Sequence, residues 1–98
     1  MEQFWTWGGE YIGVRKDDYL WCYSGKVLGK FYGHELYNAD GLYIGEINRE
    51  NRIIVNTRKR TYRRPAFSKG IAGCVSMKYR EIPVYPLLTG YADFKFEP

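Results

Sequence analysis

The sequence predicts an all-β fold of pseudo-repeated 16-residue β-hairpin units, in three and a half copies around a common axis, with an extended C-terminal arm. Three observations predict it. Glycines recur every sixteen residues, at Gly13, Gly29 and Gly45. Each of them has a second glycine four places earlier, at Gly9, Gly25 and Gly41. An apolar residue stands directly before each later glycine, at Ile12, Leu28 and Ile44.

Each unit reads as two short strands, because aromatic and β-branched residues suit a pleated, half-buried surface. The units cover residues 9–24, 25–40 and 41–56. Their thirteenth places hold Trp21, Tyr37 and Ile53. Counting back sixteen residues from Trp21 reaches Trp5, and Trp7 stands two places later. Residues 4–8 therefore read as the second half of an earlier unit.

The joints between the predicted strands carry turn signals. Gly8-Gly9, Ser24-Gly25 and Asp40-Gly41 are dipeptides that tolerate positive φ in tight hairpins. A glycine inside a strand has a different meaning, because it weakens the strand unless it allows a bulge, a bend or close backbone approach. One such glycine at the same place in every unit predicts a repeated bend.

These phased residues resemble the bacterial four-fold beta flower domain, a small all-β module of repeated hairpins. Three stretches carry the resemblance, residues 7–13, 23–31 and 40–47, and it extends over residues 4–56. The resemblance implies the repeated-hairpin architecture and brings no activity, cofactor or catalytic residue with it. A weaker similarity to MORN repeats fits less well, because those repeats have a longer period.

The predicted organisation is a repeated domain over residues 4–56, followed by a basic connector and arm over residues 57–98. About fifty residues make a marginal core. The arm should therefore pack on the same domain or on a neighbouring chain. Aromatic residues, 18% of the chain, should supply much of the core, with Tyr19, Tyr32 and Tyr43 as the more exposed rings.

Residues 57–98 read as an ordered arm with one or two short strands, because their leucines, isoleucines and aromatic residues give them surface to bury. Pro83 and Pro86 bracket an extended edge segment. Residues 91–96 alternate between apolar and polar side chains, and they are placed to complete the half unit that begins at Trp5.

The charge distribution is uneven. Residues 1–56 have six Lys and Arg against eight Asp and Glu, whereas residues 57–98 have nine against three. The cations gather in one run around Tyr62: Arg58, Lys59, Arg60, Arg63 and Arg64. Such a run could follow a nucleic-acid backbone with Tyr62 as a stacking ring. It could equally be a solvated connector, or a clamp that docks on the acidic rim of the repeats.

The tenth place of each unit holds Asp18, His34 or Glu50. Rotationally related units would bring these side chains to one rim, and oxygen and nitrogen donors suit a divalent metal. The competing interpretation is that turn residues are polar because turns face water. The sequence favours the second interpretation, so no metal or other cofactor is predicted.

Motifs for catalysis are lacking. His34 is the single histidine, no nucleophile motif surrounds a serine or cysteine, and no phosphate-binding loop precedes a helix. Cys22 and Cys74 read as two reduced thiols. The N-terminus lacks the basic region of a signal peptide, and no run approaches the roughly 18 apolar residues of a membrane span.

We therefore expect a non-enzymatic, cytoplasmic interaction module that self-associates or binds another protein and does not bind membranes. Nucleic-acid binding through residues 58–64 is the alternative. A metal-dependent enzyme at the rim of Asp18, His34 and Glu50 is the least favoured function.

Overall fold

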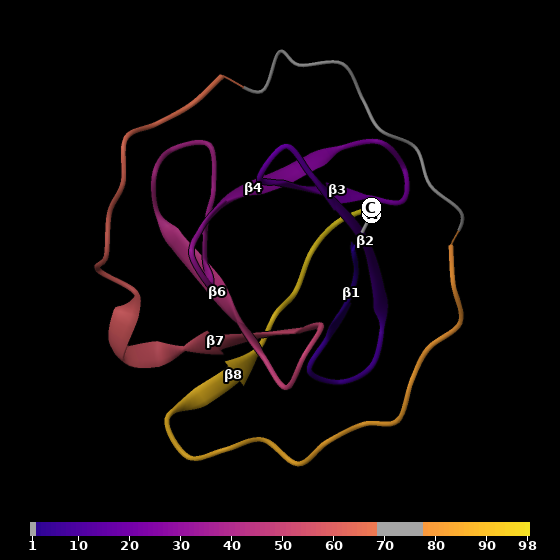
Figure 1. Cartoon of the computed structure of the whole chain (residues 1–98). Helices are drawn as coiled ribbons and strands as arrows, with labels where there is room; N and C mark the ends of the chain where they lie inside the picture. The colour runs from indigo at the N-terminus through magenta and orange to yellow at the C-terminus, as the bar shows by residue number, and fades with distance from the viewer. Residues whose placement is uncertain (1, 69–77) are drawn as a thin grey trace.

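The computed structural model describes residues 2–68 and 78–98, and it confirms an all-β chain arranged around one axis. Seven strands form a closed ring (Figure 1). They are β1 (Glu2–Thr6), β2 (Tyr11–Lys16), β3 (Tyr19–Cys22), β4 (Val27–Tyr32), β5 (Glu35–Tyr37), β6 (Tyr43–Asn48) and β7 (Arg52–Asn56). A single-turn 3-10 helix, η1 (Thr57–Lys59), follows, and β8 (Tyr91–Asp93) pairs with β7 outside the ring.

The ring is closed by its first and last strands. Consecutive strands pair antiparallel, but β1 and β7 pair parallel, with Trp5 opposite Arg52 and Thr6 opposite Ile53. The amide of Trp5 donates to the Asn51 carbonyl at 2.9 Å, and that of Trp7 donates to the Ile53 carbonyl at 3.0 Å. We call this junction the seam. It is the one place in the ring where the antiparallel pattern is broken.

The glycine period corresponds to a repeated β-bulge. Three pairs bring a buried residue opposite a strand glycine: Phe4 and Gly13, Leu20 and Gly29, Leu36 and Gly45. In each case the register then shifts, and the residue before the glycine is left without a partner. These extra residues are Ile12, Leu28 and Ile44. A bulge bends its strand and increases the local twist. Three equivalent bulges therefore curve the sheet, as the period predicts.

The turns follow the predicted chemistry. Gly9, Gly25 and Gly41 all have positive φ. Asp17 and Asp18 also have positive φ, at 54° and 66°, in the two-residue link between β2 and β3. This is the type I′ geometry whose twist matches that of the flanking strands.

The core lies inside the ring. It contains Phe4, Ile12, Leu20, Phe31 and Leu36, with the rings of Phe4 and Phe31 5.4 Å apart between centroids. Tyr43 is only 5% exposed, so the expectation that its ring is exposed was wrong. Its hydroxyl explains the burial, because it donates to Glu46 at 2.8 Å and accepts from the Asn56 amide at 2.9 Å. Cys22 is a buried free thiol, and Cys74 lies outside the described residues.

Residues 60–68 and 78–90 of the arm run along the outside of the ring (Figure 1). The Arg64 amide donates to the Gly41 carbonyl at 2.8 Å, and the Ile82 amide donates to the Gly9 carbonyl at 2.9 Å. A Cβ at Gly41 would collide with the Arg64 carbonyl oxygen, and one at Gly9 would collide with that of Ile82. The turn glycines therefore also give the arm room to dock.

The C-terminal residues reach one end of the ring. Phe94 is buried in the core cluster, and the Lys26 ammonium donates to the Glu97 carbonyl at 3.4 Å. Before that crossing, β8 pairs with Ile54–Asn56, beyond the residues of β7 that β1 uses. The expectation that residues 91–96 complete the half unit at Trp5 is therefore only partly met. Although β8 extends the sheet on β7, β1 closes the ring itself.

Candidate functional site

Part of the basic run is bound to the chain's own acids. Lys59, at the end of η1, forms ion pairs with Glu35 at 2.9 Å and with Glu46 at 3.0 Å. Asn56 caps η1 by accepting a hydrogen bond from the Arg58 amide at 3.1 Å. The cap fixes the direction in which Lys59 leaves the backbone, so that its ammonium lies between carboxylates of β5 and β6.

The protonation equilibria reflect this cluster. Burial opposes ionisation of Glu35, but hydrogen bonds from Lys59 and Tyr37 outweigh it and hold the pKa of Glu35 below its ordinary value. The hydrogen bonds to Glu35 and Glu46 raise the pKa of Lys59. Burial, together with the hydrogen bond to Glu35, raises the pKa of Tyr37. The ionised forms of Glu35 and Lys59 are therefore both stabilised in the folded chain.

Arg64 also lies against the ring of strands, with its guanidinium carbon 4.9 Å from the Tyr32 ring centroid and 5.7 Å from that of Tyr37. The remaining cations of the run, Arg58, Arg60 and Arg63, are exposed. Tyr62 is 46% exposed, and its ring packs edge-on against Tyr43. The structure thus places Lys59 and Arg64 against the ring of strands, although Arg64 remains exposed like Arg58, Arg60 and Arg63.

The acidic rim does not form a metal centre. Asp18, His34 and Glu50 lie in three different turns, and within residues 2–68 and 78–98 no group of three or more His, Cys, Asp or Glu side chains could hold an ion. Asp18 instead pairs with Arg15 at 2.9 Å.

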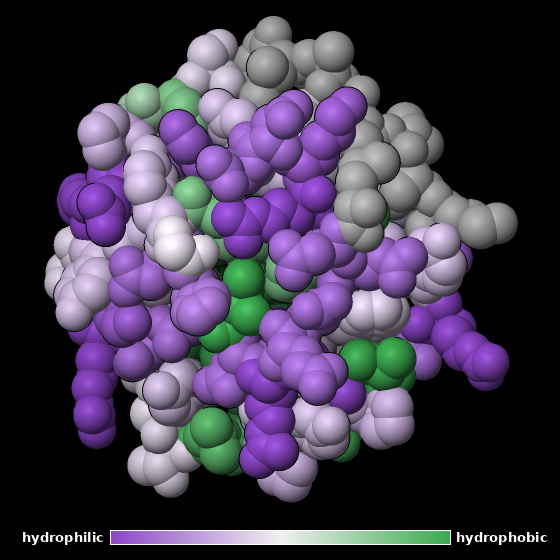
Figure 2. All heavy atoms as spheres, viewed as in Figure 1, coloured by the Kyte–Doolittle hydropathy of each residue, from purple (hydrophilic) through white to green (hydrophobic). Residues whose placement is uncertain are grey.

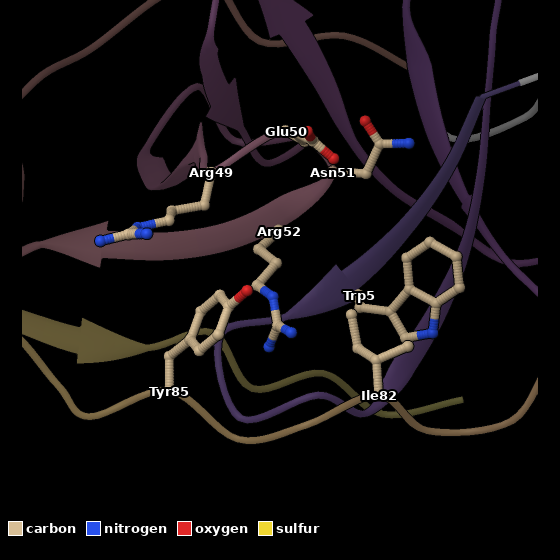
Figure 3. Close-up of a pocket in the computed structure, with 7 residues that line it drawn as sticks. All are labelled: Trp5, Arg49, Glu50, Asn51, Arg52, Ile82 and Tyr85. Atoms are coloured by element: carbon tan, nitrogen blue, oxygen red, sulfur yellow. The ribbon is translucent and has the colours of Figure 1, made fainter.

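A pocket of about 360 Å³ opens at the seam. We call it the seam pocket (Figure 3). Its lining comes from β1, the β6–β7 turn, the start of β7 and the arm: Trp5, Arg49, Glu50, Asn51, Arg52, Ile82 and Tyr85. Arm residues are held there by the indole of Trp5, which donates to the Arg80 carbonyl at 3.1 Å. The seam pocket therefore depends on both ring closure and arm docking.

Arg52 is the central residue of the seam pocket and is only 5% exposed. Its Nη1 donates to the Trp7 carbonyl at 2.9 Å, and its guanidinium carbon lies 3.9 Å from the Tyr85 ring centroid. Figure 3 shows the guanidinium of Arg52 between the Tyr85 ring and the side chains of Ile82 and Trp5. The guanidinium carbon of Arg49 lies farther from Tyr85, 5.5 Å from its ring centroid. This arrangement presents a fixed positive charge between apolar surfaces.

A second cavity, of about 600 Å³, lies where the C-terminal residues meet the ring. Leu28, Ile44 and Phe96 contribute apolar surface to it, and Arg60 and Lys95 contribute cations. Asp93 also lines it. One oxygen of this carboxylate accepts from the Gly8 amide at 3.0 Å, and the other is buried with no hydrogen-bond partner among the described residues.

The arm also carries apolar side chains into solvent. The exposed ones in residues 84–88 include Val84, Leu87 and Leu88.

In the view along the ring axis, Figure 2 shows apolar side chains at the surface in a hollow near the middle of this face, with hydrophilic side chains around them.

The residues predicted from the repeat are structural. Trp7, Trp21 and Tyr37 are buried, and Trp5 is half-buried at the seam pocket. Sequence reasoning missed Arg52 and Tyr85. Counting along the sequence puts Arg52 at the twelfth place of its unit, with Leu20 and Leu36, but the longer turn before β7 gives that place to Ile53 in the structure. Tyr85 lies outside the repeat and had no signal of its own.

Comparisons with protein-family models, with curated proteins and with solved structures find no match for this chain. In the part of the chain that the structure describes, no helix has the length and apolar character needed to cross a membrane.

Proposed function

We propose that this chain is a non-catalytic binding module that associates with a second copy of itself through the apolar segment of the arm, residues 84–88. The observation that carries the proposal is the exposure of three aliphatic side chains. Val84 is 73% exposed, Leu87 55% and Leu88 44%. Single exposed aliphatic residues are ordinary, whereas a contiguous apolar patch marks an interaction surface.

The segment is held in place by the ring. The Trp7 indole donates to the Pro86 carbonyl at 2.9 Å, and the Tyr85 ring packs edge-on against Trp7 with centroids 5.5 Å apart. A segment that is already ordered loses little conformational entropy when it binds. Its exposed side chains are thus presented as a preformed surface.

The composition of the segment favours a second copy as the partner. Residues 82–88 contain no charged side chain, although the chain has a net charge of +4. In a two-fold contact the same patch meets itself, so a charged patch would face like charges. An uncharged apolar patch avoids that repulsion and removes apolar surface from both copies.

Sedimentation equilibrium over a range of concentrations tests the proposal. We expect a concentration-dependent dimer for the unaltered chain and a monomer for Leu87→Asp, because the new carboxylate would be desolvated in the contact. Thr61→Asp is the control. It adds the same charge at an exposed position within the basic run, outside residues 84–88, and it should leave the dimer intact. A monomer at every concentration would refute self-association.

Nucleic-acid binding is the second candidate function, and the exposure of Arg58, Arg60 and Arg63 favours it. Binding through these cations should weaken steeply with salt, because phosphate contacts release counterions. An apolar dimer should persist under the same conditions. Co-sedimentation of a mixed-sequence oligonucleotide at two salt concentrations therefore distinguishes the two functions.

The proposal retains the beta flower resemblance, a cytoplasmic location and the lack of a cofactor. The buried free thiol of Cys22 supports a reducing compartment, since disulfides form and persist in oxidising ones.

A further inference from the structure

Arg52 is a buried charged residue at the start of β7. The turn before it has three residues, because Asn48 pairs with Arg52, whereas Lys16 pairs with Tyr19, and Tyr32 with Glu35, across two-residue turns. Ile53 therefore takes the core place that Leu20 and Leu36 have in the other units. Arg52 takes the place of Tyr19 and Glu35, which are only partly buried, yet it is 5% exposed.

The guanidinium of Arg52 has no anionic partner among the described side chains. The ion pairs there are those of Arg15 with Asp18 and of Lys59 with Glu35 and Glu46. The contacts of Arg52 are the Trp7 carbonyl and the face of the Tyr85 ring. Burying a charge is unfavourable unless it is paired. Among the described residues, the Arg52 guanidinium therefore has one hydrogen bond, to a backbone carbonyl, and no ion pair with a carboxylate.

The pocket beside this cation suits a small ligand. Its volume of about 360 Å³ lies within the usual range for small-molecule sites. Trp5 and Ile82 supply an aromatic and an aliphatic wall on the side that the guanidinium faces (Figure 3). Arg49 and Glu50 also line the pocket and carry opposite charges, so the charge of Arg52 remains to match one negative charge. A guanidinium pairs with a carboxylate through two parallel hydrogen bonds.

We propose that the seam pocket binds a small organic carboxylate whose head group pairs with Arg52 and whose apolar body lies against Trp5 and Ile82. This inference goes beyond self-association and does not rest on it. The docked arm completes the site, because Ile82 and Tyr85 both come from it. Tyr85 stacks on the guanidinium and holds its plane in one orientation.

The test compares two ligands that differ in charge, 3-phenylpropionate and 3-phenylpropan-1-ol, by calorimetric titration of the full chain at constant ionic strength. We expect the carboxylate to bind about tenfold or more tightly than the alcohol, because only it pairs with the guanidinium. Equal affinities, or no binding of the carboxylate, would overturn the proposal.

The Arg52→Leu variant removes the guanidinium and leaves an apolar side chain in its place. We expect it to lose the preference for the carboxylate, and its melting temperature shows whether losing the hydrogen bond to the Trp7 carbonyl also weakens the fold. Arg58→Leu removes an exposed arginine that does not line the pocket, and it should bind both ligands normally. Unchanged carboxylate binding by Arg52→Leu would overturn the assignment.

If Arg52→Leu fails to fold, Arg52→Lys decides the question. Lysine keeps the charge but cannot form the paired hydrogen bonds, so carboxylate affinity should fall several-fold while affinity for the alcohol stays the same. Unchanged carboxylate affinity contradicts the proposal. Displacement of 3-phenylpropionate by an equal concentration of inorganic phosphate would also contradict it, because the apolar body would then contribute nothing.

Discussion

Gly13 shows how one missing methyl group permits the curvature of the ring. It pairs with Cys22, and a Cβ at this position would collide with the Trp21 carbonyl oxygen. Since that oxygen belongs to backbone, it cannot move aside without disturbing β3. We expect Gly13→Ala to destabilise the fold by about 3 kcal/mol, measured as the free energy of unfolding in urea.

Gly33 provides the control for that measurement. It has a positive φ of 62°, but a Cβ there would meet nothing within 4 Å. Gly33→Ala should therefore lower the free energy of unfolding by only about 1 kcal/mol, because alanine disfavours a positive φ. Equal losses at the two positions would show that backbone conformation, rather than close approach, explains the strand glycine.

The ion pairs of Lys59 predict a pH dependence with two limits. Glu35 has a folded pKa below its ordinary 4.5, so its contribution to stability is present above that pH and is lost as the pH falls through the folded pKa. Lys59 has a folded pKa above its ordinary 10.5, so its contribution is present below that pH and is lost as the pH rises through the folded pKa. The contribution is therefore full between pH 4.5 and pH 10.5.

Glu35→Gln tests this dependence. We expect it to lower the free energy of unfolding by about 1 kcal/mol at neutral pH, because these side chains are only partly exposed, and to have little effect in strong acid. Unfolding in urea at several pH values measures the difference. Glu10→Gln removes a carboxylate from an exposed turn and is the control. A difference that persists in acid would mean that Glu35 acts through its shape rather than its charge.

Among the elements, the C-terminal residues stabilise one end of the barrel through the side chain of Phe94. Phe94 is buried in the core, and Phe96 packs on it while remaining partly exposed. We expect Phe94→Ala to cost about 3 kcal/mol and Phe96→Ala about 1 kcal/mol, because only the first leaves a cavity in the core. Urea unfolding of both variants measures this. A Phe94 loss no larger than that of Phe96 would contradict the placement of the C-terminal residues in the core.

The elements also show what the sequence could predict. The sixteen-residue period predicted the paired strands, the turns and a bend at each strand glycine, because bulges depend on local residues such as Ile12 and Gly13. The choice of Lys59 and Arg64 as the docked cations could not be predicted from composition. That choice depends on the direction in which a capped turn leaves β7, which a run of similar residues does not reveal.

At the scale of the whole molecule, closure of the ring could not be read from the period. A repeat predicts the curvature of each unit but not the number of strands at which the first strand meets the last. The C-terminal strand β8 was therefore expected to complete the half unit at Trp5, although β1 alone closes the ring. The seam pocket escaped prediction for the same reason, because Arg52 and Tyr85 come together only after the ring has closed and the arm has docked.

Closure predicts a hierarchy of stability. The two strands at the seam, β1 and β7, each have a paired strand on both sides, whereas β8 pairs only with β7. We expect the amides of Trp5 and Trp7 to exchange hydrogen only through global unfolding, and those of β8 to exchange through a smaller opening. Native-state hydrogen exchange measures both. Matching exchange free energies for the seam and β8 would show that the ring and the arm unfold together.

The parallel seam also has a consequence for the order in which the molecule is assembled during synthesis. Every other pair in the ring joins strands that are neighbours along the chain, so hairpins can form one after another as residues emerge. The strand that meets β1 ends at Asn56, before the arm begins. The ring can therefore close while the arm is still being made, and the arm then docks on a barrel that has already formed.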